Sequence, residues 1–235
     1  MASQDKLILY TNHRCPYAHR AHIALEELKV PFEEVIIDLD TPRTPEYLKI
    51  NPRGLVPALS HNGEIIIESA IVVQYLTDLY PSHLVPASNE PGGALRRARI
   101  ALFVDAFSTK FNTPLFGLYT AQTEAEKDAL IEKAVGGLVA EVEPQLADAA
   151  PFFGGSDKLT LAEVLTASFV IRLKTLSAAE VIPKKLWTAI EEKAPNFVKW
   201  AEVVSKHPSV TSIYNESEMI EGAKKRIAKL LAAKK

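Results

Sequence analysis

Residues 6–20 read KLILYTNHRCPYAHR, and this stretch decides how the chain begins to fold. It opens with a short, mainly apolar, strand-like run, and apolar residues then recur at helical spacing from Ala21 to Leu28. Pro16 suits the first turn of a helix, where its missing N–H would have no intrahelical partner. The pattern predicts a strand, a short loop and a helix that begins directly after Cys15.

Cys15 is the only cysteine in the chain and the first candidate for chemistry. At a helix N-terminus, unpaired N–H groups and the helix dipole stabilise an anion, and the thiolate is the reactive form of cysteine. No internal disulfide can form, so thiol–disulfide exchange at Cys15 would need an outside thiol to resolve a mixed disulfide. The alternative is a buried cysteine that acts only as a small apolar side chain.

Composition excludes several function classes. The chain has 235 residues, which is enough for one large domain or two small ones, and its net charge is −2. No basic patch with interleaved aromatic residues suggests nucleic-acid binding. The first residues lack the apolar core of a signal peptide, and no apolar run approaches the length of about 18 residues that a membrane span needs. A single cysteine fits a reducing compartment, so we expect a cytoplasmic protein without a membrane span.

The order of strand and helix signals changes along the chain. Residues 1–83 follow the order β-α-β-α-β-β-α, with the hairpin signal Asn62-Gly63 between the last two strands. Residues 84–93 are rich in turn-forming residues and are interpreted as a linker. Residues 94–235 carry only helical periodicity, and Thr160 to Glu163 form a capping box. We expect an α/β N-terminal domain followed by an all-α C-terminal domain.

This arrangement resembles the cytosolic glutathione transferases, in which a thioredoxin-like domain precedes a helical one. Four motifs carry the resemblance: the cysteine motif at residues 15–18, NPRGLVPAL at 51–59, ESAI at 68–71 and the capping box at 160–163. The first is similar to the omega class, which uses cysteine where most classes use tyrosine or serine. The resemblance implies glutathione as co-substrate, Cys15 as the catalytic residue and a homodimer. It implies a glutathione site of Tyr17, Arg43, Leu55, Val56, Pro57, Glu68 and Ser69.

Glutathione itself explains several of these residues, because it carries an amine and two carboxylates. Glu68 can pair with the amine, and the N-terminus of a helix that begins at Ser69 can bind the neighbouring carboxylate. A cis-Pro57 would let Val56 offer its backbone to the cysteinyl part. Arg43 stands in for a lysine of the omega pattern that this chain lacks. The alternative for Glu68 and Ser69 is an ordinary pair that opens a helix.

A second-substrate pocket is expected between the domains. Its predicted residues are Phe107, Phe111, Tyr119, Arg172 and Ile220. Arg172 is a charge in an otherwise apolar helix, and a guanidinium there needs an acceptor or an open cavity. An omega arginine at the matching position lies near that pocket, and Ile220 stands where the omega pattern has tryptophan. The alternative for the aromatic side chains is that they belong to the core.

The resemblance implies a glutathione-dependent thiol transferase, with dehydroascorbate reduction and deglutathionylation as further activities. A non-catalytic protein that binds hydrophobic aromatic molecules on the same fold is the alternative. Cys15, His19 and His22 share a helix face, which suggests a metal site. Because no fourth ligand is evident, we expect no metal.

Overall fold

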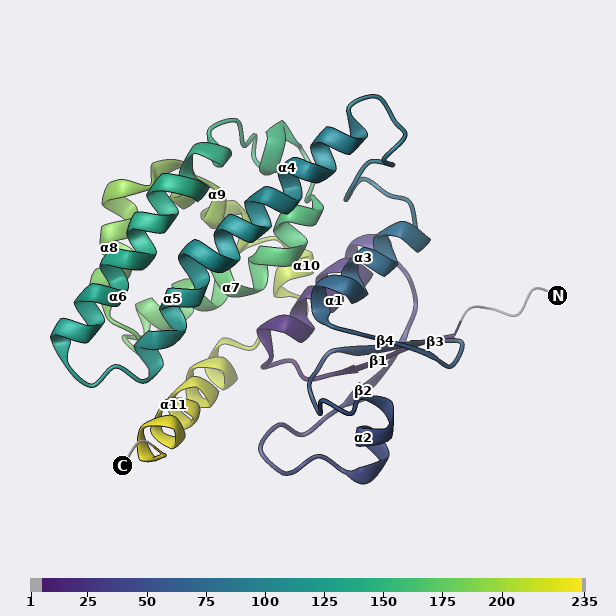
Figure 1. Ribbon diagram of the computed structural model, residues 1–235, viewed down its shortest axis with the longest axis horizontal. Coiled ribbons are helices and arrows are strands. Elements are labelled where there is room, and N and C mark those ends of the chain that lie inside the picture. Colours follow the sequence, from purple (N-terminus) through teal and green to yellow (C-terminus); the bar gives the residue numbers. More distant parts are fainter. Residues whose placement is uncertain (1–5, 234–235) are drawn as a thin grey trace. The chain divides into compact units, whose positions relative to one another are not determined.

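The computed structural model describes residues 6–233, and their contacts divide the chain between Ser82 and His83 (Figure 1). We call residues 6–82 unit 1 and residues 83–233 unit 2. The expected linker begins inside unit 2, because Leu84 and Val85 are buried and the Leu84 carbonyl accepts a hydrogen bond from the Leu161 N–H at 2.8 Å.

Unit 1 contains a four-stranded mixed sheet in the order β2-β1-β3-β4. Strand β1 (Leu7–Thr11) is parallel to β2 (Glu33–Ile36) and antiparallel to β3 (Ala58–His61), which pairs with β4 (Glu64–Ile67). The predicted hairpin turn between β3 and β4 is confirmed, since Asn62 and Gly63 both have positive φ values, as a two-residue type I′ turn requires.

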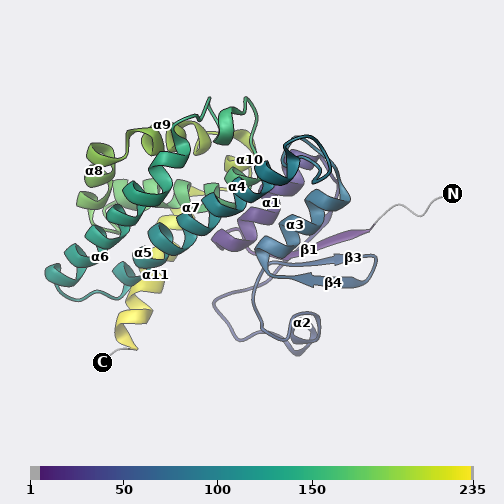
Figure 2. The same ribbon diagram turned by 45° about the horizontal axis from the view of Figure 1, so that its top comes forward.

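Three helices cover the two faces of this sheet. Helices α1 (Pro16–Leu28) and α3 (Ser69–Leu79) pack together on one face, and α2 (Pro45–Ile50) lies on the other (Figure 2). Helix α2 packs on the sheet through Tyr47, and the centroid of the Tyr47 ring lies 5.9 Å from that of Tyr10 in β1. This is the predicted β-α-β-α-β-β-α order, and it places the N-terminus of α1 beside the start of β3.

Unit 2 is entirely helical and is built around α7 (Leu161–Ala178), which is buried along nearly its whole length. It contacts helices from several parts of unit 2, including α4 and α9. The remaining elements are α4 (Gly93–Ala106), η1 (Phe107–Asn112), α5 (Thr113–Phe116), η2 (Gly117–Tyr119), α6 (Glu124–Gly137), η3 (Leu138–Val142), η4 (Glu143–Leu146), η5 (Phe153–Gly155), α8 (Lys184–Lys193), α9 (Pro195–Val204), α10 (Pro208–Thr211) and α11 (Glu216–Ala232). None of the helices in residues 6–233 is long and apolar enough to cross a membrane.

Glu163 organises the start of α7. The predicted capping box with Thr160 is confirmed, and the buried carboxylate also accepts hydrogen bonds from the Phe153 N–H at 2.8 Å and the Trp200 ring N–H at 2.7 Å. One side chain thus joins α7 to η5 and α9. A second capping box, Thr123 with Glu126, opens α6 at the surface.

Candidate functional site

Cys15 is the N-cap residue of α1, with Pro16 in the first turn, as predicted. Its backbone N–H donates to the Asn12 carbonyl at 3.0 Å, and its own carbonyl accepts from the His19 N–H at 3.0 Å. The side chain is partly exposed. A partly exposed cysteine at the start of a 13-residue helix lies where the helix stabilises negative charge.

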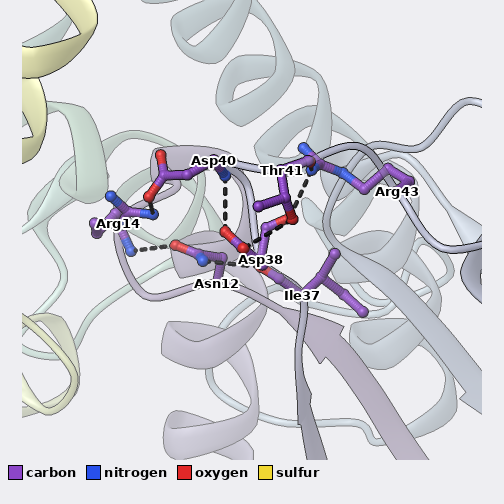
Figure 3. Close-up of polar contacts among 7 residues, drawn as sticks. All are labelled: Asn12, Arg14, Ile37, Asp38, Asp40, Thr41 and Arg43. Atoms are coloured by element: carbon purple, nitrogen blue, oxygen red, sulfur yellow. Dashed lines mark hydrogen bonds and ion pairs between the residues drawn. The ribbon is translucent and has the colours of Figure 1, made fainter.

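The loop that carries Cys15 is tied to the loop after β2 (Figure 3). The Asn12 side-chain amide donates to the Ile37 carbonyl at 2.9 Å, while its oxygen accepts from the Arg14 N–H at 3.0 Å. The Arg14 guanidinium pairs with Asp40 at 2.8 Å. These contacts connect the two loops, so the position of Cys15 depends on the segment after β2 as well as on α1.

Arg20 brings a buried positive charge to the same helix. Burial lowers the pKa of Arg20 to about 10, and the side chains of Tyr17 and Cys15 act in the opposite direction. The guanidinium remains charged at neutral pH, donates to the Ser69 hydroxyl at 3.2 Å and lies over the Tyr17 ring at 5.3 Å. Arg20 therefore places a positive charge on the helix that Cys15 opens and links α1 to the first residue of α3.

The segment before β3 lies against Cys15. The Val56–Pro57 peptide bond is cis, as predicted, and the Cys15 thiol approaches the Val56 carbonyl oxygen with Sγ at 3.8 Å. The Leu55 side chain is exposed, while its carbonyl accepts from the Tyr47 hydroxyl at 2.5 Å and the Asn51 amide at 2.8 Å. The backbone beside the cysteine is thereby held by Tyr47 of α2 and by Asn51, the C-cap residue of that helix.

Glu68 and Ser69 stand at the start of α3, as the sequence predicts. Glu68 is the N-cap residue with φ of 71°, a left-handed conformation that is costly for a residue with a side chain. Its partly exposed carboxylate forms an ion pair with Arg53. Ser69 is buried and receives the Arg20 hydrogen bond. The strained conformation fixes the direction of Glu68 at a helix N-terminus that favours an anion.

Two other predicted glutathione residues have different surroundings. Tyr17 is 41% exposed and packs against Arg20, so its ring is available near Cys15. Arg43 instead bonds to backbone carbonyls: it donates to Gly54 at 2.9 Å, Asp38 at 2.5 Å and Thr41 at 2.7 Å. These hydrogen bonds hold the loop, and the expected contact between Arg43 and glutathione stays a prediction.

The sequence reasoning missed two cations of this site. Arg20 is the one formally charged side chain between Arg14 and Glu26, which is the same signal that singled out Arg172. Arg53 lies in a turn motif that gives no indication of its pairing with Glu68, because strands β3 and β4 separate the two residues in the sequence.

The predicted pocket residues of unit 2 separate into core and partly exposed positions. Phe107 and Phe111 are 1% and 0% exposed, with ring centroids 5.5 Å apart, and they contact further phenylalanines of unit 2. Both belong to the aromatic core, which corrects their expected place on a ligand-facing surface. Ile220 is partly exposed on α11. Tyr119 lines a cavity of about 460 Å³ among η2, α6, α8 and α11.

Arg172 has acceptors within its own unit. Its guanidinium donates to the Ser168 carbonyl at 2.8 Å and lies over the Tyr214 ring at 5.4 Å. Burial raises the pKa of Tyr214 and of Tyr119, and the positive charge of Arg172 opposes both shifts. The predicted acceptor for this buried charge is therefore present, and the two tyrosines form its surroundings in unit 2.

Comparisons with known proteins agree with this fold and site. The family model "Glutathione S-transferase, N-terminal domain" matches residues 9–88. Glutathione S-transferase omega-1 of Mus musculus is 26% identical over 219 residues, which cover 91% of this chain and 85% of the relative. Glutathione S-transferase U22 of Arabidopsis thaliana is 28% identical over 227 residues, covering 96% and 98%.

A solved structure extends the similarity to both units. The crystal structure of glutathione transferase Omega 1C from Trametes versicolor matches with a TM-score of 0.81 at 25% identity and covers 96% of this chain and 98% of that one. The sequence relatives are similarly aligned along nearly the whole chain. Residues 9–88 therefore match the N-terminal domain of the glutathione transferases, and the chain is similar to omega-class members of that family along nearly its whole length.

Proposed function

We propose that this chain is a glutathione-dependent thiol transferase of the omega type. The observation that carries the proposal is the half-exposed Cys15 at the N-terminus of α1, with its sulfur beside the Val56 carbonyl. A nucleophilic sulfur stands where other members of the fold use a hydroxyl, and the omega-1 relative supports the same assignment.

The reaction consists of two exchanges at sulfur. The Cys15 thiolate attacks the glutathionyl sulfur of a mixed disulfide, forms a Cys15–glutathione disulfide and releases the other thiol. The thiolate of a second glutathione then attacks the glutathionyl sulfur of this intermediate, releasing Cys15 thiolate and glutathione disulfide. The sulfur of the second glutathione is oxidised from thiol to disulfide as the substrate sulfur is reduced to a thiol, while the first glutathionyl sulfur stays in a disulfide throughout. Because Cys15 has no partner cysteine in the chain, glutathione must resolve the intermediate.

A direct assay tests this proposal. The purified chain is given the mixed disulfide of glutathione and 2-mercaptoethanol, with glutathione as reductant, and formation of glutathione disulfide is followed. Turnover in proportion to enzyme is the expected result. Absence of turnover together with retained glutathione binding would favour the non-catalytic binding protein.

Replacing Arg20 with glutamine is expected to slow alkylation of Cys15 by iodoacetamide at neutral pH by about tenfold, because a nearby cation worth about 1.4 kcal/mol to the thiolate is lost. The matched control is Arg14→Gln. It removes the positive charge of the residue before Cys15, and this charge is already paired with Asp40. Equal rates in the two variants would show that Arg20 does not support the thiolate.

Glu68 is proposed to bind the ammonium group of glutathione. Glu68→Ala is expected to raise KM for glutathione by about tenfold or more, since a charge-assisted hydrogen bond is worth about 1.5–3 kcal/mol. Alkylation of Cys15 without glutathione should stay unchanged. Glu64→Ala, in exposed strand β4, is the control. An unchanged KM for Glu68→Ala would assign Glu68 to the Arg53 pair alone.

A further inference from the structure

A cluster of metal-ligating side chains lies on unit 1, separate from the glutathione-binding residues proposed above. His13 from the β1–α1 loop, His22 from α1 and Glu34 from β2 place their ligand atoms within 4.8 Å of one another. His13 Nε2 and Glu34 Oε1 are 2.6 Å apart, and His22 Nε2 is 3.4 Å from the same oxygen. Three different elements thus converge on one point.

We propose that His13, His22 and Glu34 form a binding site for a divalent transition-metal ion of the zinc type. Two imidazoles and a carboxylate are a ligand set that Zn²⁺ accepts, with a fourth position left for water. Among residues 6–233, these are the three possible metal ligands whose ligand atoms lie close together. The sequence had instead suggested Cys15 and His19 as the partners of His22.

The spacing of the ligand atoms fits such an ion after a small adjustment. Zinc–ligand distances of about 2.1 Å at tetrahedral angles place neighbouring ligand atoms about 3.4 Å apart. The His22–Glu34 distance already has this value, while the shorter His13–Glu34 contact is a hydrogen bond. A bound ion replaces the proton of that bond, and also the Thr11 hydroxyl that lies 2.9 Å from His22 Nε2. Because two hydrogen bonds are given up, we expect affinity in the micromolar range.

The surroundings of the cluster hold one ligand in place and leave the other two open to solvent. The His22 side chain is 4% exposed. The side chains of His13 and Glu34 are 39% and 33% exposed, which leaves a path from solvent. The His22 ring also packs edge-on against His13 and Phe32, which holds its orientation.

A metal ion here would act on the loop that carries Cys15. His13 lies two residues before Cys15, and the Asn12 carbonyl between β1 and His13 accepts the Cys15 N–H. Coordination would fasten this loop to β2 and α1 at once. Because the ion binds only the folded arrangement, it should raise the unfolding temperature in proportion to the logarithm of its excess over Kd.

The test is a calorimetric titration of the metal-free, tag-free chain with Zn²⁺, without glutathione, together with the absorption spectrum of the Co²⁺ form. We expect one equivalent bound per chain, visible Co²⁺ ligand-field bands without a thiolate charge-transfer band, and a higher unfolding temperature. His13→Ala and Glu34→Gln should each weaken binding at least tenfold. Both positions are partly exposed, so these variants are expected to fold, which circular dichroism verifies.

Three variants serve as matched controls. Glu33→Gln removes the neighbouring carboxylate, which pairs with Lys6, and His83→Ala removes an exposed histidine of unit 2. Cys15→Ser removes the thiol. All three should bind Zn²⁺ as the unmodified chain does. Absence of saturable binding, equal binding by the His13 and Glu34 variants, or loss of binding on removal of Cys15 would each overturn the proposed site.

Discussion

Replacing Cys15 with serine is expected to lower thiol transfer by at least about a thousandfold, because a serine hydroxyl is not ionised at neutral pH and cannot form the mixed disulfide. The helix N-terminus and the Arg20 charge that favour a thiolate cannot compensate for this difference in acidity. The measurement is the rate of glutathione disulfide formation from a glutathione mixed disulfide.

The same variant also separates binding from chemistry. Cys15 is partly exposed, and serine has nearly the same shape as cysteine. Cys15→Ser should therefore unfold at the same temperature and bind glutathione with similar affinity. Transfer at the unmodified rate would remove Cys15 from the mechanism. Loss of glutathione binding together with activity would mean that the thiol is needed to form the site rather than to react in it.

Replacing Glu163 with alanine is expected to reduce the free energy of unfolding by about 4 kcal/mol. The carboxylate is fully buried and accepts hydrogen bonds from the N–H groups of Phe153, Thr160 and Trp200 and from the Thr160 hydroxyl. Without the carboxylate, these buried donors have lost this acceptor. Burying a donor without its acceptor lowers the free energy of unfolding. The urea midpoint of unfolding measures the loss.

The second capping box supplies the control for Glu163. Glu126 accepts from the Thr123 and Gln122 N–H groups at the exposed start of α6, where water can replace it. Glu126→Ala should cost only about 1 kcal/mol. Glu163→Gln keeps one acceptor oxygen and should fall between the two. Similar losses for Glu163→Ala and Glu126→Ala would contradict the role assigned to burial.

Most of unit 1 and the start of the central helix of unit 2 could be predicted because their signals are local. A proline after Cys15 marks the start of α1, Asn62 and Gly63 specify a turn with positive φ, and Thr160 with Glu163 specify the start of α7. Each feature depends on residues within three positions of one another. The cis-Pro57 and the role of Glu68 came from the family resemblance instead, since no local pattern requires them.

Contacts between distant segments could not be predicted in this way. In the sequence, Glu34 is one of two adjacent acidic residues and gives no sign of a site, and it reaches His13 and His22 because β2 pairs in parallel with β1. Arg43 stood near the position of a family lysine, but the loop after β2 presents three carbonyl oxygens to it. Helical periodicity placed Phe107 and Phe111 on one helix face and did not say whether that face meets the core or a ligand.

The measurement that tests the central claim most directly is the intact mass of the chain after brief exposure to glutathione disulfide at neutral pH, followed by excess glutathione. The account predicts a gain of one glutathionyl group per chain, located on Cys15 by peptide mapping, absent from Cys15→Ser and removed by glutathione. A chain that binds glutathione but acquires no such adduct, or whose adduct glutathione does not remove, would contradict thiol transfer through Cys15.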